Sequence, residues 1–317
     1  MMRNQRRECR RWTKSFILVP AVVLWLALAS QAVLAAAPAD ATNWMGAVSG
    51  KKRVSELSIP GTHDSGALHE PFPGSTKCQT LSIAQQLAIG VRFLDIRCRS
   101  VHNAFAIYHG PVDQQLTFDS VLADCLGFLK AHGTETIIMS VKKEGEDDQS
   151  TKSFEELFDA YAAQAPEKWW LKATIPTLEE ARGKIILLQR FQAAKLPKGI
   201  GAAPEDWKDN QGFHIHGAAE IQVQDKYKLA EQQDKWPEVL AMLQTAASGK
   251  PDTLYLNFTS GYRPRPILGI PDIREISNVV NPAVSHYFEQ TGPGRYGIII
   301  MDFADSSRCA KIIATNQ

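Results

Sequence analysis

The chain has 317 residues, of which 44% are hydrophobic and 22% are charged. This length suits one large domain or two small ones, and the composition is ordinary for a globular protein with one sizeable core. Six of the 35 Lys and Arg residues and one of the 34 Asp and Glu residues lie in the first 37 positions, so the remainder carries a net charge of −4. That balance excludes the basic field that a nucleic-acid partner would require.

The first 37 residues have the pattern of a secretory signal peptide. A basic head is followed by an apolar run from Phe16 to Ala29 and then by small residues from Val33 to Pro38. The alternative is a membrane anchor, but the run is shorter than the roughly 20 residues that a spanning helix needs, and Pro20 interrupts it. We therefore expect residues 1–37 to be removed on export, leaving a secreted protein, extracellular or periplasmic.

Four cysteines follow that segment: Cys78, Cys98, Cys125 and Cys309. An even number in an exported protein permits two disulfides, and the sequence does not distinguish the three pairings. Their spacing is not that of a zinc site, and buried free thiols are the alternative.

Eight apolar segments rich in β-branched residues predict strands. They are Leu57–Pro60, Val91–Arg97, Ala104–Tyr108, Thr136–Val141, Lys184–Arg190, Ala219–Gln224, Thr253–Phe258 and Tyr296–Phe303. Several are nearly continuous apolar runs, as at residues 298–301, and such runs are typical of parallel strands covered on both faces.

Amphipathic stretches between many of these strands predict helices. They are Leu81–Ile89, Leu116–His132, Phe154–Ala165, Glu231–Ala247 and Pro282–Gln290. The alternation predicts an α/β fold over residues 38–317, a single (β/α)8 barrel of the TIM type. We expect an irregular barrel, because the link at residues 98–103 is too short for a helix. Residues 261–272, rich in Pro, Gly and Arg, predict a long loop.

Polar residues gather at the ends of the predicted strands. In barrels of this kind, functional groups lie at the carboxyl ends of the strands. We therefore expect two histidines, several cations and several carboxylates to converge on one mouth. They are His63, Asp64, Asp95, Arg97, His109, Lys142, Arg190, Asp225, Tyr227 and Asp302.

The motifs around these residues resemble bacterial phosphatidylinositol-specific phospholipase C in order and approximate spacing, from about Trp44 to Asp302. The matching segments are Ser58–Gly66, Phe93–Arg97, His109–Pro111, Glu135–Glu144, Ala181–Arg190, Val223–Lys228 and Tyr255–Ser260. Pro-Gly-Thr-His-Asp-Ser at residues 60–65 is the most specific. The resemblance implies a phospholipase C catalytic barrel that cleaves phosphatidylinositol to diacylglycerol and inositol 1,2-cyclic phosphate, with glycosylphosphatidylinositol anchors as a further expected substrate.

The resemblance also implies catalytic roles. His63 would be the base that activates the inositol 2-hydroxyl, and His109 the acid that protonates the diacylglycerol oxygen, since imidazole titrates near neutrality. Asp302 would partner the base and Asp64 the acid. Arg97 would hold the non-bridging phosphate oxygens with its fork.

Further residues match substrate-binding positions. Lys142, Arg190, Asp225 and Tyr227 match the positions that bind the inositol ring. Asp95 is also assigned to the substrate-binding residues. It lies two positions before Arg97 on the same face of the strand and would orient it.

A guanidinium at the Arg97 position would repel a divalent ion and supply the charge itself, so the resemblance implies no metal and no cofactor. We expect a monomer that contacts a membrane surface peripherally to reach phosphatidylinositol.

Two other functions fit parts of the pattern. A metal-dependent glycerophosphodiester phosphodiesterase or sphingomyelinase D-like enzyme would need a carboxylate cluster for its ion, and Arg97 speaks against it. A non-catalytic inositol-lipid binding module would not need both His63 and His109.

Some residues remain outside this scheme. His214 and His216 alternate on one face of a candidate strand like a metal-binding pair, but no third ligand stands out nearby. Trp169 and Trp170 fit either a membrane interface or the core, and we expect the core. The apolar loop at residues 266–271 is a candidate lipid contact.

Overall fold

The computed structural model describes residues 40–264 and 272–317, which lie within one compact unit, residues 37–317. The predicted signal peptide and the apolar loop at residues 266–271 lie outside the described residues. Within the described part, none of the helices is both long and apolar enough to cross a bilayer.

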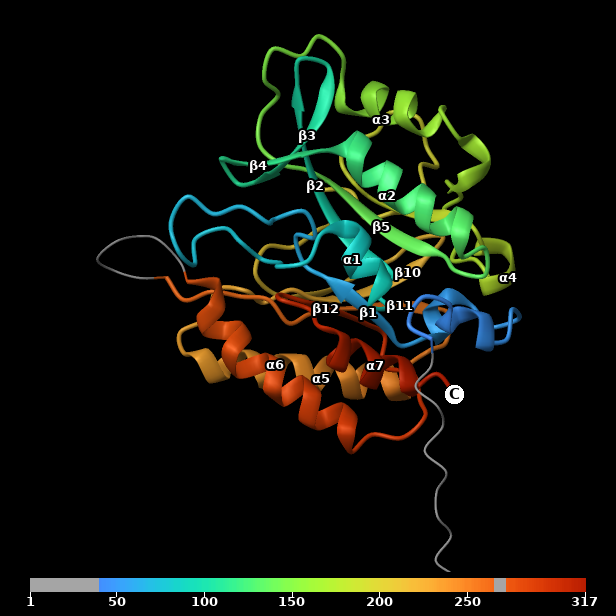
Figure 1. Cartoon of the computed structure of the whole chain (residues 1–317), viewed down its shortest axis with the longest axis vertical. Helices are drawn as coiled ribbons and strands as arrows, with labels where there is room; N and C mark the ends of the chain where they lie inside the picture. Colours follow the sequence, from blue (N-terminus) through green and yellow to red (C-terminus); the bar gives the residue numbers. More distant parts are fainter. Residues whose placement is uncertain (1–39, 265–271) are drawn as a thin grey trace, which may run out of the picture. The chain divides into compact units, whose positions relative to one another are not determined.

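One curled sheet forms the centre of the molecule (Figure 1). Its hydrogen-bonded order is β6-β7-β5-β2-β1-β12-β11-β10-β9, with β3 and β4 attached to β2 and with β8 attached to β7. The strands are β1 (Ile59–Thr62), β2 (Phe93–Val101), β3 (Ala104–His109), β4 (Val112–Thr117), β5 (Ile137–Lys143), β6 (Trp169–Trp170), β7 (Ile185–Arg190), β8 (Ile200–Gly201), β9 (Gly212–Ile215), β10 (Glu220–Gln224), β11 (Thr253–Phe258) and β12 (Ile298–Met301).

The parallel strands make an irregular TIM-type barrel, and the predicted α/β fold is confirmed. Strands β7, β11 and β12 are buried along their whole length, as expected of apolar runs covered on both faces. All eight predicted strands are present, with some ends shifted by a few residues. Among the described residues, the hydrogen-bonded path stays open between its ends, β6 and β9.

The short link after β2 is a hairpin turn. His102 and Asn103 both have positive φ, 48° and 61°, the backbone of a two-residue turn of type I′. Strand β3 therefore runs antiparallel to β2, with Ile107 opposite Cys98. The hairpin returns His109 to the level of the residues just before Cys98.

Helices pack outside the strands. They are α1 (Ile83–Ala88), α2 (Phe118–Ala131), α3 (Phe154–Ala162), α4 (Leu178–Ala181), α5 (Lys235–Ser248), α6 (Ile273–Glu289) and α7 (Ser306–Ala314). Helices α5, α6 and α7 lie together on one side of the strands, and α2 and α3 lie on the other (Figure 1). Helix α7 was not predicted from the sequence; Asp305 caps it by accepting a hydrogen bond from Arg308 N.

Helix α6 was predicted to begin at Pro282, and that prediction is wrong. The helix begins at Ile273, where the Asp272 side chain accepts a hydrogen bond from Arg274 N. Pro282 lies inside the helix, where its ring removes one backbone donor. The packing of Ile276, Val280 and other residues of the buried face keeps the helix continuous across it.

The core resolves two of the open alternatives. Trp169 and Trp170 are only 7% and 6% exposed, so both pack in the core, as expected. Each of the four described cysteines is a buried free thiol, so neither of the two permitted disulfides is present. Burial raises the pKa of each thiol, which keeps the sulfur protonated and unreactive.

Candidate active site

A pocket of about 550 Å³ lies at the carboxyl ends of the barrel strands. Eight of the ten predicted site residues line it: His63, Arg97, His109, Lys142, Arg190, Asp225, Tyr227 and Asp302. The other two, Asp64 and Asp95, are completely buried behind its wall. The structure therefore brings the predicted residues together, although they are separated by up to about 240 positions in the chain.

His63 is held between an acid and a cation. It follows β1, Asp302 follows β12, and these two strands pair in parallel with Thr62 opposite Met301. His63 Nδ1 donates to Asp302 Oδ1 at 2.8 Å, and Arg97 Nη2 donates to His63 Nε2 at 2.7 Å. Since a carboxylate only accepts and a guanidinium only donates, His63 carries its proton on Nδ1 and its lone pair on Nε2.

His109 contacts two buried side chains through its Nδ1. Its Nδ1 lies 3.0 Å from Asp64 Oδ2 and 3.6 Å from Cys78 Sγ. Asp64 directly follows His63 and has a φ of 39°, a strained left-handed backbone that turns its carboxylate under the pocket. Asp64 Oδ2 also lies 3.5 Å from Arg97 Nη1, so one carboxylate contacts both His109 and Arg97.

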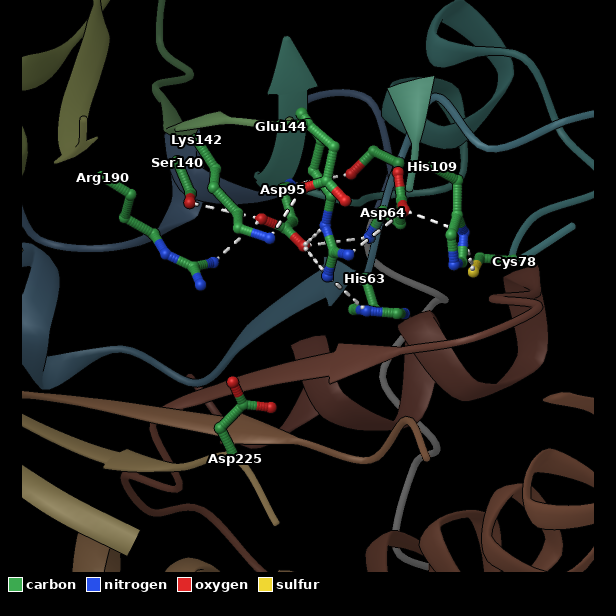
Figure 2. A network of polar contacts seen from close by, with 12 residues as sticks. His63, Asp64, Cys78, Asp95, His109, Ser140, Lys142, Glu144, Arg190 and Asp225 are labelled. Carbon is green, nitrogen blue, oxygen red and sulfur yellow. Dashed lines mark hydrogen bonds and ion pairs between the residues drawn. The ribbon is translucent and has the colours of Figure 1, made fainter. Parts of the chain in front are cut away.

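Asp95 braces two guanidiniums (Figure 2). Its Oδ2 lies 3.3 Å from Arg97 Nη2, and its Oδ1 lies 3.2 Å from Arg190 Nη1. Burial alone would raise the pKa of Asp95, but the charges of Arg97 and Arg190 outweigh it and hold that pKa well below its usual range. Asp95 is fully buried, does not line the pocket and lies behind its wall, where it is placed to orient Arg97.

Three cations lie side by side across the pocket floor. Strand register places Arg97 of β2 opposite Lys142 of β5, and Lys142 opposite Arg190 of β7. Burial would lower the pKa of Arg97, but Asp64 and Asp95 raise that pKa well above its ordinary value. Burial, together with the nearby Arg97 charge, lowers the pKa of Lys142. The row forms a concentrated positive surface suited to a phosphate and neighbouring hydroxyls.

Glu144 is a pocket residue that the sequence analysis did not assign. Its Oε2 accepts from Lys142 Nζ at 2.6 Å, and its Oε1 accepts from Gly110 N at 3.0 Å. Burial would raise its pKa, but Arg97 and Lys142 lower it to about 2. The alternation of β5 was the available signal, since Glu144 follows Lys142 by two positions.

Trp207 is a second unassigned pocket residue. It lies in the loop between β8 and β9, where neither periodicity nor a strand end marks it. The Arg190 guanidinium carbon lies 3.5 Å from the centroid of its ring, and Trp207 Nε1 donates to Asp225 Oδ2 at 3.0 Å. It therefore joins the cation row to Asp225, which lies across from that row (Figure 2).

Two sets of side chains in the site have metal-ligand spacing. His63 with Cys78 and Asp302, and Asp64 with Cys78 and His109, each bring their ligand atoms within 4.8 Å of one another. Both sets depend on Cys78. Burial raises the pKa of its thiol and keeps the sulfur protonated, and a protonated thiol is a poor metal ligand. The Arg97 charge at 2.7 Å from His63 also opposes a cation there.

Comparison with known proteins identifies the family. Residues 57–191 match the model of the phosphatidylinositol-specific phospholipase C X domain. A 1-phosphatidylinositol phosphodiesterase of Staphylococcus aureus is 33% identical over 278 residues, which cover 83% of this chain and 88% of that protein. The chain belongs to the phosphatidylinositol-specific phospholipase C family. The predicted family and the prediction of an enzyme are therefore confirmed.

Other members of the phospholipase C family support the same placement. The 1-phosphatidylinositol phosphodiesterase of Listeria monocytogenes is 31% identical over 292 residues, which cover 86% of this chain and 84% of that protein. A crystal structure of the S. aureus phospholipase C superposes with a TM-score of 0.81 at 29% identity, covering 88% of this chain and 99% of that one. The Listeria structure gives a TM-score of 0.69 at 26% identity, with the same coverage of both chains.

Proposed function

We propose that this phospholipase C cleaves phosphatidylinositol by attack of the inositol 2-hydroxyl, releasing diacylglycerol and inositol 1,2-cyclic phosphate. The observation that carries the proposal is the protonation pattern of His63, whose Nδ1 donates to Asp302 and whose Nε2 keeps a lone pair that accepts from Arg97. A nitrogen of this kind can accept the proton of a hydroxyl, and the second histidine, His109, lines the same pocket.

Each side chain has a step in this scheme. His63 Nε2 takes the 2-hydroxyl proton, and Asp302 stabilises the imidazolium that forms. The fork of Arg97 binds the non-bridging oxygens, where negative charge builds in the transition state. His109, supported by Asp64, donates a proton to the departing diacylglycerol oxygen. The two histidines exchange roles when water opens the cyclic phosphate.

The inositol ring would bind beside the phosphate. Lys142 and Arg190 extend the cation row away from Arg97 and can donate to ring hydroxyls, while the Asp225 carboxylate can accept from them. The ring of Tyr227, whose hydroxyl donates to Asp209, can stack on the less polar face of the polyol. Glycosylphosphatidylinositol anchors share the inositol phosphodiester and are a further proposed substrate.

The proposed reaction needs no metal ion. Arg97 is permanently charged, is held by Asp64 and Asp95, and is aimed at the pocket. It supplies at the phosphate the positive charge that a calcium ion would otherwise provide.

We further propose that the protein is exported after removal of residues 1–37 and acts as a monomer on membrane surfaces. The charge and hydropathy of those residues support export. A solved structure of the S. aureus phospholipase C is described in terms of its membrane binding. Mass spectrometry of the protein recovered from the culture medium would show a new N-terminus near residue 38. An intact Met1 in that fraction would refute the cleavage.

One assay tests the chemistry. Purified protein is incubated with phosphatidylinositol vesicles, with and without a chelator, and the products are followed by phosphorus NMR and by diacylglycerol release. We expect inositol 1,2-cyclic phosphate to form first, at equal rates in both samples. Loss of activity in chelator that metal restores would instead support a metal-dependent phosphodiesterase. Binding to the vesicles without diacylglycerol release would support a non-catalytic module.

A further inference from the structure

The hairpin of β9 and β10 carries two histidines and a glutamate on one face. Ile215 pairs with Ile221 across the hairpin, so the next step in register sets His216 opposite Glu220. Directly opposed residues of an antiparallel pair project on the same side of the sheet, and His214 shares that side with His216 because it lies two positions before it. The strand pairing thus brings all three side chains to one face.

Their polar atoms converge on one point. Glu220 Oε2 lies 3.0 Å from His214 Nε2 and 2.9 Å from His216 Nδ1. The two imidazole centroids are only 4.2 Å apart, with the rings tilted by 37°. All three ligand atoms lie within 4.8 Å of one another. Two imidazole nitrogens and a carboxylate oxygen are a ligand set that zinc takes in proteins, with water in the fourth position.

The spacing is close to that of a bound ion. Zinc bonds of about 2.0–2.2 Å in a tetrahedron separate the ligand atoms by roughly 3.3–3.5 Å. The Glu220 oxygen would therefore need to move only about 0.3–0.6 Å from each imidazole nitrogen. The His216 side chain, 74% exposed, is free to make that adjustment. A neighbouring cavity of about 500 Å³, which also borders Glu205 and Asp206, leaves His216 accessible from solution.

We propose that His214, His216 and Glu220 form a binding site for a divalent transition-metal ion of the zinc class. Nitrogen and carboxylate ligands favour such an ion over calcium or magnesium, which prefer oxygen alone. None of the three residues lines the catalytic pocket, so the ion is separate from phosphodiester chemistry.

The ion would brace a hairpin that leads into the active site. Strand β10 ends at Gln224, one residue before Asp225, and Phe213 of β9 packs against Trp207 with ring centroids 5.3 Å apart. Trp207 in turn donates to Asp225. An ion that joins the two strands at their turn therefore stabilises the element that carries Asp225, and the expected readout is thermal stability.

The experiment measures binding of zinc alone to the purified, chelator-stripped protein. We expect titration calorimetry to give one ion per chain, with the affinity falling at least about tenfold in each of His214→Gln, His216→Gln and Glu220→Gln. His286→Gln, at an exposed position on α6, is the matched control and should bind like the wild type. Zinc should raise the Tm of the wild type and the control but not of the three variants.

Two outcomes would overturn the proposal. Undiminished zinc binding in His216→Gln and Glu220→Gln would place the ion elsewhere, with the catalytic histidines as the obvious holders. Absence of binding at a zinc concentration of about 100 μM would show that the three side chains only hydrogen-bond to one another. Activity on phosphatidylinositol vesicles, expected to be retained in all variants, confirms that the protein tested is folded.

Discussion

Nη2 of Arg97 lies 2.7 Å from Nε2 of His63. The cation proposed to hold the phosphate thus contacts the nitrogen proposed to take the proton. In the proposed mechanism, phosphate oxygens compete with His63 for the N–H groups of this guanidinium, and a guanidinium that turns to the phosphate uncovers the lone pair of His63. Phosphate binding and availability of the base are therefore linked through one side chain.

Arg97→Lys tests the fork. A lysine places one point charge where the guanidinium holds two oxygens and a ring nitrogen, so we expect kcat to fall by about 10²–10³. The measurement is steady-state turnover of phosphatidylinositol vesicles. Arg99→Lys, two residues further along β2 and outside the pocket, is the matched control and should behave like the wild type. A wild-type rate in Arg97→Lys would rule out two-pronged phosphate contact.

His63→Ala and His109→Ala test the acid–base pair. Each variant loses one proton-transfer group, so we expect turnover to drop by about 10²–10⁴ in each. Circular dichroism and Tm should stay close to the wild type, since both side chains face the pocket. His286→Ala on α6 serves as the control. Full activity in either pocket variant would remove that histidine from the mechanism.

Asp95→Asn tests the support behind the cations. It removes the buried charge between Arg97 and Arg190, and we expect the free energy of unfolding at pH 7 to fall by about 3–5 kcal/mol. Because the folded-state pKa of Asp95 is depressed, its contribution is present above the unfolded pKa of about 3.9 and is lost as the pH falls below it.

Urea unfolding from pH 7 to pH 2 measures this dependence. The difference between wild type and Asp95→Asn should stay constant down to about pH 5 and shrink at lower pH. A difference that does not change across this range would mean that the charge of Asp95 does not stabilise the fold.

A second pH effect on stability is expected from Lys235, where burial itself, and not a charged partner, shifts the pKa. This fully buried lysine donates from Nζ to Gln224 Oε1 and to the Lys226 carbonyl, and burial lowers its pKa to about 8. The unfolded chain, with a lysine pKa of about 10.4, binds more protons between these values, so stability rises with pH there. Relative to Lys235→Met, the wild type should gain up to about 3 kcal/mol between pH 8 and pH 10.5. Parallel unfolding curves for the two proteins over this range would contradict that prediction.

The sequence predicted the class of fold and most of the pocket because those signals are local. Apolar runs indicate burial on both faces, and a polar residue directly after such a run lies at a strand end, as His63 and Asp302 do. Residues whose placement depends on contacts between distant parts of the chain were not predicted. Trp207 lies in a loop with no periodicity, and Glu220 becomes a partner of His216 only because the chain reverses between them.

The polar residues that follow buried strands could thus be recognised from local sequence, since burial and periodicity depend on neighbouring positions. Tertiary structure alone decided which of them meet. Strand order sets Asp302 beside His63, register aligns Arg97 with Lys142 and Arg190, and a tight hairpin returns His109 to the same mouth. Pairing between strands is fixed by long-range packing and backbone hydrogen bonds, which no single segment of the chain contains.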